Sequence, residues 1–181
     1  DAPGYPAALR ELRDPPAVLY VCGRLPTDGV PAVSLVGTRT PSAYGARVAY
    51  SAARDLASAG VTVVSGLALG VDACAHAGAL RADGVTVAFV ACGPDVVYPA
   101  SHRRLYQALL RRGAVVGEYP PGTTAVRHHF PARNRLVSGY ARATVLVEGA
   151  RDSGSLITAR RALSQARPTY AVPGRLDDPR G

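Results

Sequence analysis

Residues 32–66 read AVSLVGTRTPSAYGARVAYSAARDLASAGVTVVSG and contain one complete unit of strand, helix and strand. The runs Ala32–Val36 and Val61–Val64 are short, apolar and rich in β-branched residues, which is typical of strands buried on both faces. Between them, apolar residues recur at helical spacing over Gly45–Leu56, and Gly60 can end the helix. This stretch therefore predicts a right-handed crossover between two parallel strands.

The same alternation continues along the chain. Further strands are expected at Val85–Ala91, Ala114–Val116, Thr144–Val147 and Thr169–Val172. One further helix is expected to be capped by Ser101 and to end at Gly113, and another to run from about Ser155 to Ala166. The pattern predicts an α/β fold with a doubly wound, mostly parallel sheet and helices on both faces.

The ends of the chain set the expected domain organisation. Residues 1–30 are rich in proline, so we expect a lead segment that packs on the core rather than a long helix. Residues 31–181 are expected to form one domain, because 181 residues with 48% apolar content suit a single buried core. The chain does not begin with Met, so we expect it to be a fragment of a longer protein.

Composition indicates the class of partner and the compartment. The net charge is +8, and all 21 lysine-plus-arginine residues are arginine, which pairs with phosphate in a planar, bidentate way. This favours a polyanionic partner. Cys22, Cys74 and Cys92 are odd in number and lack CxxC spacing, so we expect free thiols in the cytoplasm. No apolar run approaches the length of a membrane span.

Small and polar residues follow several of the expected strands. In a doubly wound sheet, ligands bind beyond the carboxyl ends of the strands. The turn at 37–39 precedes a helix whose free N–H groups can bind phosphate. The turn at 153–155 is interpreted as an anion-binding turn, because it lacks the Gly-x-Ser-x-Gly frame of a nucleophile. The candidate residues in these turns are Gly37, Thr38, Arg39, Ser65, Gly66, Ser153 and Gly154.

The segment Arg127–Arg135, RHHFPARNR, is a second candidate and is expected to form a loop between two strands. Phe130 is one of only two phenylalanines in the chain and lies among cations and imidazoles. An aromatic platform beside phosphate-binding cations is how many proteins hold single-stranded nucleic acid. A solvated basic loop anchored by Phe-Pro is the alternative.

Two features invite an enzymatic interpretation. Asp72 and His76 are four residues apart, so on a helix they share a face and can bind a metal or act as an acid/base pair. No third ligand has matching spacing, and an Asp near a helix N-terminus commonly interacts with the helix dipole, so we favour a structural role. Glu118 follows a strand and is either an acid/base or a turn cap. We expect neither a metal nor a cofactor.

The expected turns and helix starts contain a series of motifs in a fixed order, which are Gly37–Arg39 with Ser42–Gly45, Ser65–Asp72 with Ala75-His76, Gly93 with Tyr98-Pro99, Glu118–Gly122, Phe130–Arg135, Ser153–Arg160 and Val172–Gly174. Taken in this order, they resemble the motifs of the DNA-processing protein DprA (Smf) family. The resemblance extends from Tyr5-Pro6 to Gly174. It implies an extended Rossmann-like domain that binds single-stranded DNA without enzymatic turnover, protects incoming DNA and helps to load the RecA recombinase in natural transformation.

The resemblance also implies roles for single residues. The phosphate site of the family, Gly-Ser-Arg, falls on 37–39 with Thr in place of Ser. A Lys and a Phe of the family match Arg127 and Phe130, and Phe130 is expected to stack on a base. The remaining expected DNA contacts are Asn134 and Arg135.

Arg133 and Arg135 are two residues apart and cannot share a helix face, so at most one of them is expected to reach the pocket. We favour Arg135 as a pocket or structural residue and expect Arg133 to face solvent. For His129 two roles remain, a hydrogen bond to phosphate or a hydrogen bond to the backbone.

Partners and alternatives follow from the same comparison of motifs. Relatives continue past the Val-Pro-Gly motif with a segment that contributes to dimer contact, so a homodimer is expected for the full-length protein rather than for this fragment. We also expect this fragment to lack the flanking domains of the family. The alternative function is a nucleotide-binding or nucleotide-hydrolysing enzyme of the related phosphoribohydrolase type, although the Pro-Gly-Gly-x-Gly-Thr-x-x-Glu motif of those enzymes is absent. A small-nucleotide sensor without catalysis is a third possibility.

Overall fold

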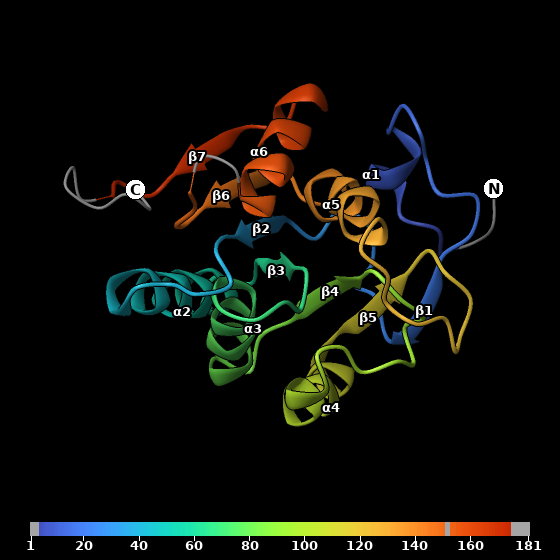
Figure 1. Ribbon diagram of the computed structural model, residues 1–181, viewed down its shortest axis with the longest axis horizontal. Helices are drawn as coiled ribbons and strands as arrows, with labels where there is room; N and C mark the ends of the chain where they lie inside the picture. Colours follow the sequence, from blue (N-terminus) through green and yellow to red (C-terminus); the bar gives the residue numbers. More distant parts are fainter. Residues whose placement is uncertain (1–3, 151–152, 175–181) are drawn as a thin grey trace.

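The computed structural model describes residues 4–150 and 153–174 of the chain. Its centre is a seven-stranded sheet in the order β1-β5-β4-β3-β2-β6-β7 (Figure 1). All neighbouring strands are parallel except β1, which pairs antiparallel with β5 at one edge. The strands are β1 (Tyr20–Gly23), β2 (Ala32–Val36), β3 (Thr62–Ser65), β4 (Thr86–Val90), β5 (Ala114–Gly117), β6 (Ala143–Leu146) and β7 (Thr169–Ala171).

Helices cover both faces of the sheet (Figure 1), which confirms the predicted doubly wound α/β class. On one face lie α2 (Ala43–Ser58), α3 (Val71–Arg81) and α4 (Arg103–Arg112), the last preceded by the 3-10 turn η1 (Ala100–His102). On the other lie α1 (Ala7–Arg10), α5 (His129–Tyr140) and α6 (Gly154–Ser164). No helix within the described residues is long and apolar enough to cross a membrane.

Two local expectations were wrong. The basic segment at 127–135 is not a loop, because α5 begins at His129 and Pro131 lies in its first turn, where the missing N–H group costs no hydrogen bond. Ser101 does not cap α4, because it lies inside η1 and neither η1 nor α4 has a side-chain cap. By contrast, Ser42 caps α2 by accepting a hydrogen bond from the Gly45 N–H at 3.0 Å.

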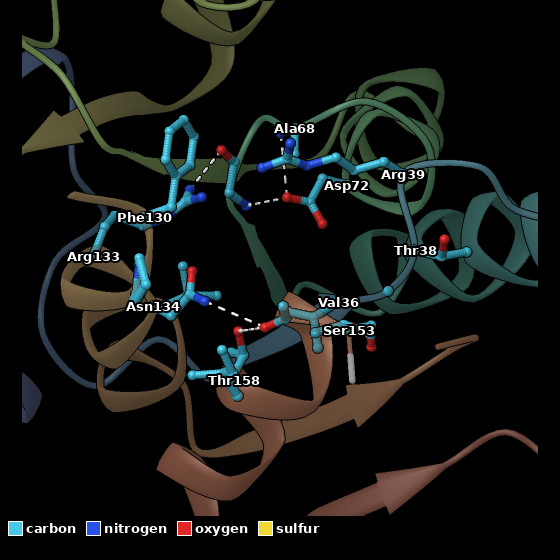
Figure 2. A pocket seen from close by; sticks show the side chains of 17 residues that line it. Val36, Thr38, Arg39, Ala68, Asp72, Phe130, Arg133, Asn134, Ser153 and Thr158 are labelled. Carbon is cyan, nitrogen blue, oxygen red and sulfur yellow. Dashed lines mark hydrogen bonds between the residues drawn. The ribbon is translucent and has the colours of Figure 1, made fainter. Parts of the chain in front are cut away.

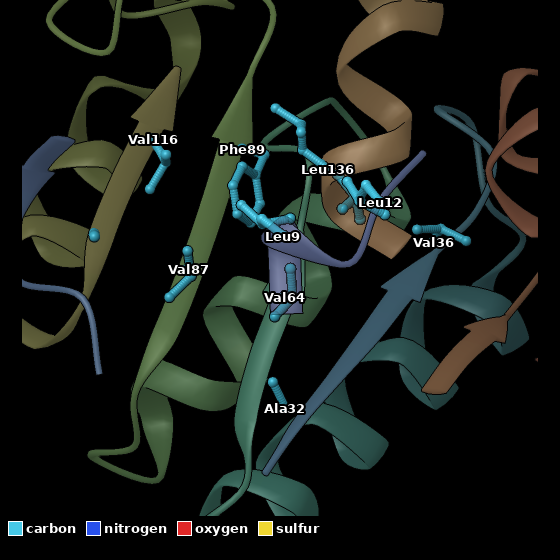
Figure 3. Close-up of a cluster of buried hydrophobic side chains, with 11 residues drawn as sticks. Leu9, Leu12, Ala32, Val36, Val64, Val87, Phe89, Val116 and Leu136 are labelled. Carbon is cyan, nitrogen blue, oxygen red and sulfur yellow. The ribbon is translucent and has the colours of Figure 1, made fainter. Parts of the chain in front are cut away.

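The main core lies between the sheet and the α1/α5 layer (Figure 3). Leu9 and Leu12 of the lead segment pack there against Phe89 of β4 and Leu136 of α5. Residues 4–30 are therefore part of the fold, since they supply core side chains and the edge strand β1. On the opposite face, smaller apolar clusters join α2, α3 and α4 to the sheet.

The strand order places a crevice between β2 and β6. From β2 the chain adds β3, β4 and β5 on one side, and then returns to add β6 on the other side of β2. The connections after β2 and β6 lead to α2 and α6 on opposite faces of the sheet (Figure 1). In doubly wound folds such a reversal of strand order opens a ligand site beyond the carboxyl ends of the strands.

Candidate functional site

A cavity of about 330 Å³ lies at this reversal point (Figure 2). Its walls come from the turns after β2, β3 and β6 and from the first turns of α5 and α6, as the strand-end argument predicts. The structure therefore brings together most of the candidate residues. Those that line the cavity are Gly37, Thr38, Arg39, Gly66, Phe130, Asn134, Ser153 and Gly154.

The floor of the cavity is built around Gly66. Asp72 accepts hydrogen bonds from the N–H groups of Gly66 at 3.1 Å and Ala68 at 3.2 Å. The guanidinium of Arg133 donates to the carbonyls of Gly66, at 2.6 Å, and Phe89. A Cβ on Gly66 would lie 2.3 Å from Nη1 of Arg133 and 2.7 Å from Oδ2 of Asp72, so this position requires glycine.

The expectation that Arg133 faces solvent is wrong. Only 5% of the residue is exposed, because the helical register of α5 places it on the same face as the buried Leu136 and Val137. Burial lowers the pKa of Arg133 and raises that of Asp72, and the opposite charge of each partner offsets part of the effect. Among the described residues, Nε of Arg133 is buried without a hydrogen-bond partner. Thus at most one of the two arginines reaches the cavity, as expected, but it is Arg133.

The N-terminus of α2 is not free to bind phosphate, contrary to the prediction. The carboxylate of Glu148 accepts hydrogen bonds from the Ser42 N–H at 3.1 Å and from the Ser42 hydroxyl at 2.8 Å. A Cβ on Gly45 would lie only 1.9 Å from this carboxylate. The carboxylate of Glu148 therefore occupies the position at which the positive end of the α2 dipole would otherwise attract the anion of a ligand.

The N-terminus of α6 is arranged differently. Gly154, Ser155 and Thr158 line the cavity, and the side chain of Ser153, the N-cap residue, makes no capping hydrogen bond. The Ser153 hydroxyl lies 2.7 Å from that of Ser155 instead. Asn134 ties α5 to this end of α6, since its amide donates to the Gly154 carbonyl at 3.3 Å (Figure 2). The positive end of α6 therefore faces the cavity.

Arg39 and Phe130 form the rim of the cavity. Cζ of Arg39 lies 5.3 Å from the centre of the Phe130 ring, within the range of a cation–π contact (Figure 2). Arg39 is exposed and has no ion-pair partner among residues 4–150 and 153–174. Its charge is therefore available to a ligand anion, beside an aromatic ring.

Three candidate residues do not line the cavity. Ser65 is buried, and its hydroxyl donates to the Leu35 carbonyl at 2.7 Å. Arg135 forms ion pairs with Glu118 at 2.7 Å and Asp14 at 3.0 Å. Of the two roles expected for Arg135, pocket residue or structural residue, these contacts support the structural one. Arg127 is exposed in the segment before α5.

His76, His129 and Asp72 have structural contacts. His76 is fully buried with Nδ1 2.7 Å from the Thr86 hydroxyl, and the Asp72 carboxylate bonds to the 66–68 turn instead. No group of three metal-ligating side chains occurs among the described residues. Nδ1 of His129 lies 3.2 Å from the Ala91 carbonyl, so of its two expected hydrogen bonds, to phosphate or to the backbone, the structure has the backbone one. The His129 ring stacks on Tyr119 with 3.7 Å between the ring centres.

Comparison with known proteins identifies the family. Residues 1–181 match the family model of DNA recombination-mediator protein A. Protein Smf of Synechocystis sp. is 41% identical over 181 residues, which cover 98% of this chain and 46% of that protein.

Two solved structures are similar over nearly the whole chain. The X-ray structure of DNA processing protein A from Streptococcus pneumoniae matches with a TM-score of 0.90 and 38% identity, over 97% of this chain and 62% of that one. A structure of DNA processing protein A from Helicobacter pylori, described for its single-stranded DNA binding mode, matches with a TM-score of 0.87 and 32% identity, over 96% and 80% of the two chains.

The chain spans about half the length of the curated relatives it matches, between 46% and 59% for the first three. Within that span, the sequence matches run through the turns that build the cavity. The match of residues 1–181 to the family model, with 41% identity to a curated relative and a TM-score of 0.90 to a solved structure, shows that this chain belongs to the DNA recombination-mediator protein A (DprA/Smf) family.

Proposed function

We propose that this chain is the single-stranded DNA-binding domain of a DNA-processing protein. The observation that carries the proposal is the contact between an exposed cation, Arg39, and an aromatic ring, Phe130, at the rim of a cavity that the N-terminus of α6 also lines. A volume of about 330 Å³ is at the lower end of the range for small-ligand pockets, about 300–1,000 Å³, and suits one nucleotide rather than a dinucleotide.

Each part of the cavity has a role in this proposal. Arg39 and the N-terminus of α6 bind phosphate, and Phe130 contacts a base. Arg127, which is exposed in the segment before α5, takes a neighbouring phosphate. Recognition by charge and by ring faces is tolerant of sequence, because every nucleotide has a phosphate and a base with a π face.

The contacts of the carboxylates support a binding role without turnover. Asp72 is held by backbone N–H groups, Glu148 by the start of α2, and Glu118 by Arg135. Among the described residues, the titratable side chains that line the cavity are Arg39, Asp72 and Arg133, and the two buried ones bond to backbone groups of the floor. A general acid or base needs a proton that it can exchange within reach of the substrate.

The role of the full-length protein follows the family. We infer that it protects incoming single-stranded DNA and helps to load the RecA recombinase in natural transformation, and that the whole protein forms a homodimer. We place it in the cytoplasm, where its three free cysteines stay reduced.

Fluorescence anisotropy of a labelled oligo-dT and of the matching duplex, over a series of salt concentrations, tests the DNA-binding proposal. We expect preference for the single strand. If about four phosphates are neutralised, the logarithm of the association constant should fall with the logarithm of salt concentration with a slope near −3.

Arg39→Glu should abolish the preference. Arg142→Glu is the matched control, because Arg142 is also exposed but directly precedes β6, at the amino end of that strand, whereas the cavity lies beyond the carboxyl ends of the strands. Equal affinity for duplex and single strand, or equal loss in the two variants, would refute the proposal. Release of free base from a nucleoside monophosphate would favour the enzymatic alternative instead.

A further inference from the structure

A second, smaller hollow adjoins the cavity across the Arg39–Phe130 rim. Its volume is about 50 Å³, and Arg39, Gly66, Ala68 and Phe130 line both spaces. The residues that line only the smaller hollow include Leu67, Leu69, Tyr98 and Pro99. A strand that leaves the cavity over Phe130 therefore meets this apolar hollow next.

Tyr98 is the exposed aromatic ring at this hollow. The residue is 45% exposed, and Leu69 beside the same hollow is 47% exposed. Single exposed apolar residues are common, but two large ones at the mouth of one hollow, next to a phosphate-binding arginine, form a small apolar surface.

The Phe130 ring already contacts both Arg39 and Tyr98. The Arg39 guanidinium lies over the Phe130 ring at 5.3 Å, and the Tyr98 ring is 5.7 Å from it, centre to centre, tilted by 56°. These separations are those of direct contacts, so no base fits between the two rings as they stand. The more accessible aromatic surface at this rim belongs to Tyr98.

The segment that carries Tyr98 is held in place and followed by cations. Nδ1 of His102, in η1, lies 3.1 Å from the Leu67 carbonyl and so ties the segment to the floor of the hollow. Arg103 and Arg104, both exposed, begin α4 directly after η1. Aromatic groups interleaved with cations along one surface are typical of single-strand binding.

We propose that Tyr98 is a second base-stacking site, which takes the nucleobase adjacent to the nucleotide held in the cavity. The proposal rests on the single-stranded DNA-binding function above and extends it by one nucleotide. Any of the four bases fits, because stacking uses the π face that all bases share. Arg39 lies between the two base positions and holds the phosphate that connects them.

Affinity measurements with Tyr98→Ala test this site. We expect binding of oligo-dT to weaken about 5- to 150-fold, the range for loss of one stacked base, with the salt slope unchanged because no counterion is involved. Tyr98→Phe should keep the affinity. Tyr170→Ala is the matched control, since Tyr170 is 60% exposed on β7 at the far edge of the sheet.

Tyrosine fluorescence gives a second readout that does not depend on a destabilising variant. The chain has nine tyrosines and no tryptophan, so its emission reports tyrosine directly. Oligo-dT should quench this emission in the wild type and in Tyr170→Phe, and quench it less in Tyr98→Phe. An oligomer of abasic deoxyribose phosphate should bind the wild type and Tyr98→Ala equally.

The outcomes separate the two proposals. Wild-type affinity in Tyr98→Ala, with binding still abolished by Arg39→Glu, overturns the stacking site and leaves the DNA-binding function intact. Equal quenching in Tyr98→Phe and the wild type also overturns it. Failure of the wild type to prefer single-stranded DNA overturns both.

Discussion

Acidification should destabilise the fold through one residue, His76. The Thr86 hydroxyl donates to the Val63 carbonyl at 2.8 Å, so the contact of 2.7 Å between Nδ1 of His76 and that hydroxyl is a donation by the imidazole N–H. Nε2 is then the unprotonated nitrogen, and it is buried with no partner among the described residues. Burial lowers the pKa of His76 from 6.5 to about 3, and the positive charges of His102 and Arg133 add to the effect.

The sign and size of the loss follow from the two pKa values. The folded state binds this proton more weakly than the unfolded chain, so the stability that His76 contributes is complete above pH 6.5 and decreases as pH falls toward 3. At pH 5 the imidazole of the unfolded chain is about 30 times more often protonated than neutral, whereas His76 in the folded protein stays neutral. The free energy of unfolding should therefore drop by about 2 kcal/mol between pH 8 and pH 5, or about 4–8 °C in Tm for a domain of this size.

Urea unfolding of the wild type and of His76→Asn across this pH range measures the loss. Asparagine keeps a side-chain N–H donor for Thr86 but does not titrate, so the difference in unfolding free energy between the two proteins isolates the proton. We expect that difference to shrink by about 2 kcal/mol from pH 8 to pH 5. Parallel curves for the two proteins would refute a neutral, buried His76.

Two further substitutions test the surroundings of the cavity. Arg133→Met should lower the free energy of unfolding by about 3–5 kcal/mol in urea titrations, because it leaves the Asp72 charge buried without its partner, and adding Asp72→Asn should recover part of the loss. A double variant no more stable than Arg133→Met would contradict that coupling. Glu148→Gln should cost about 1 kcal/mol in the same assay, because a neutral amide interacts more weakly with the start of α2 than a carboxylate does. No change for Glu148→Gln would mean that Ser42 alone caps this helix.

The parallel part of the sheet could be predicted because its strands are continuous apolar runs. β2 and β4 are buried along nearly all of their length, so hydrophobicity alone marks them. β1 was missed because its exposed and half-buried residues alternate at the edge of the sheet, within a segment dominated by proline. The start of α5 was missed because Pro131 suggests a loop, although the first turn of a helix accepts proline.

The position of the cavity could be predicted, because the topology of the sheet decides it. The turns at 37–39 and 153–155 meet because the carboxyl ends of parallel strands meet at one edge, whatever the side chains are. The position of Arg133 was missed because charged residues are mostly exposed, and the carbonyls that accept hydrogen bonds from its guanidinium come from two separate strand ends. Its spacing from Leu136 and Val137 was the available signal, since positions three and four apart share a helix face.

The position of Glu148 bears on how the proposed phosphate site differs from that of dinucleotide-binding domains. In doubly wound dinucleotide-binding domains, the pyrophosphate sits at the N-terminus of the helix after the first strand, held by backbone N–H groups of fixed geometry. Here the Glu148 carboxylate occupies that place at the start of α2. Among the described residues, the donors at the cavity include the N-terminus of α6 and Arg39, an exposed side chain that can follow its ligand. A fixed ring of N–H groups suits one rigid nucleotide, whereas a single-stranded polymer of variable backbone conformation is better met by a movable cation beside aromatic rings.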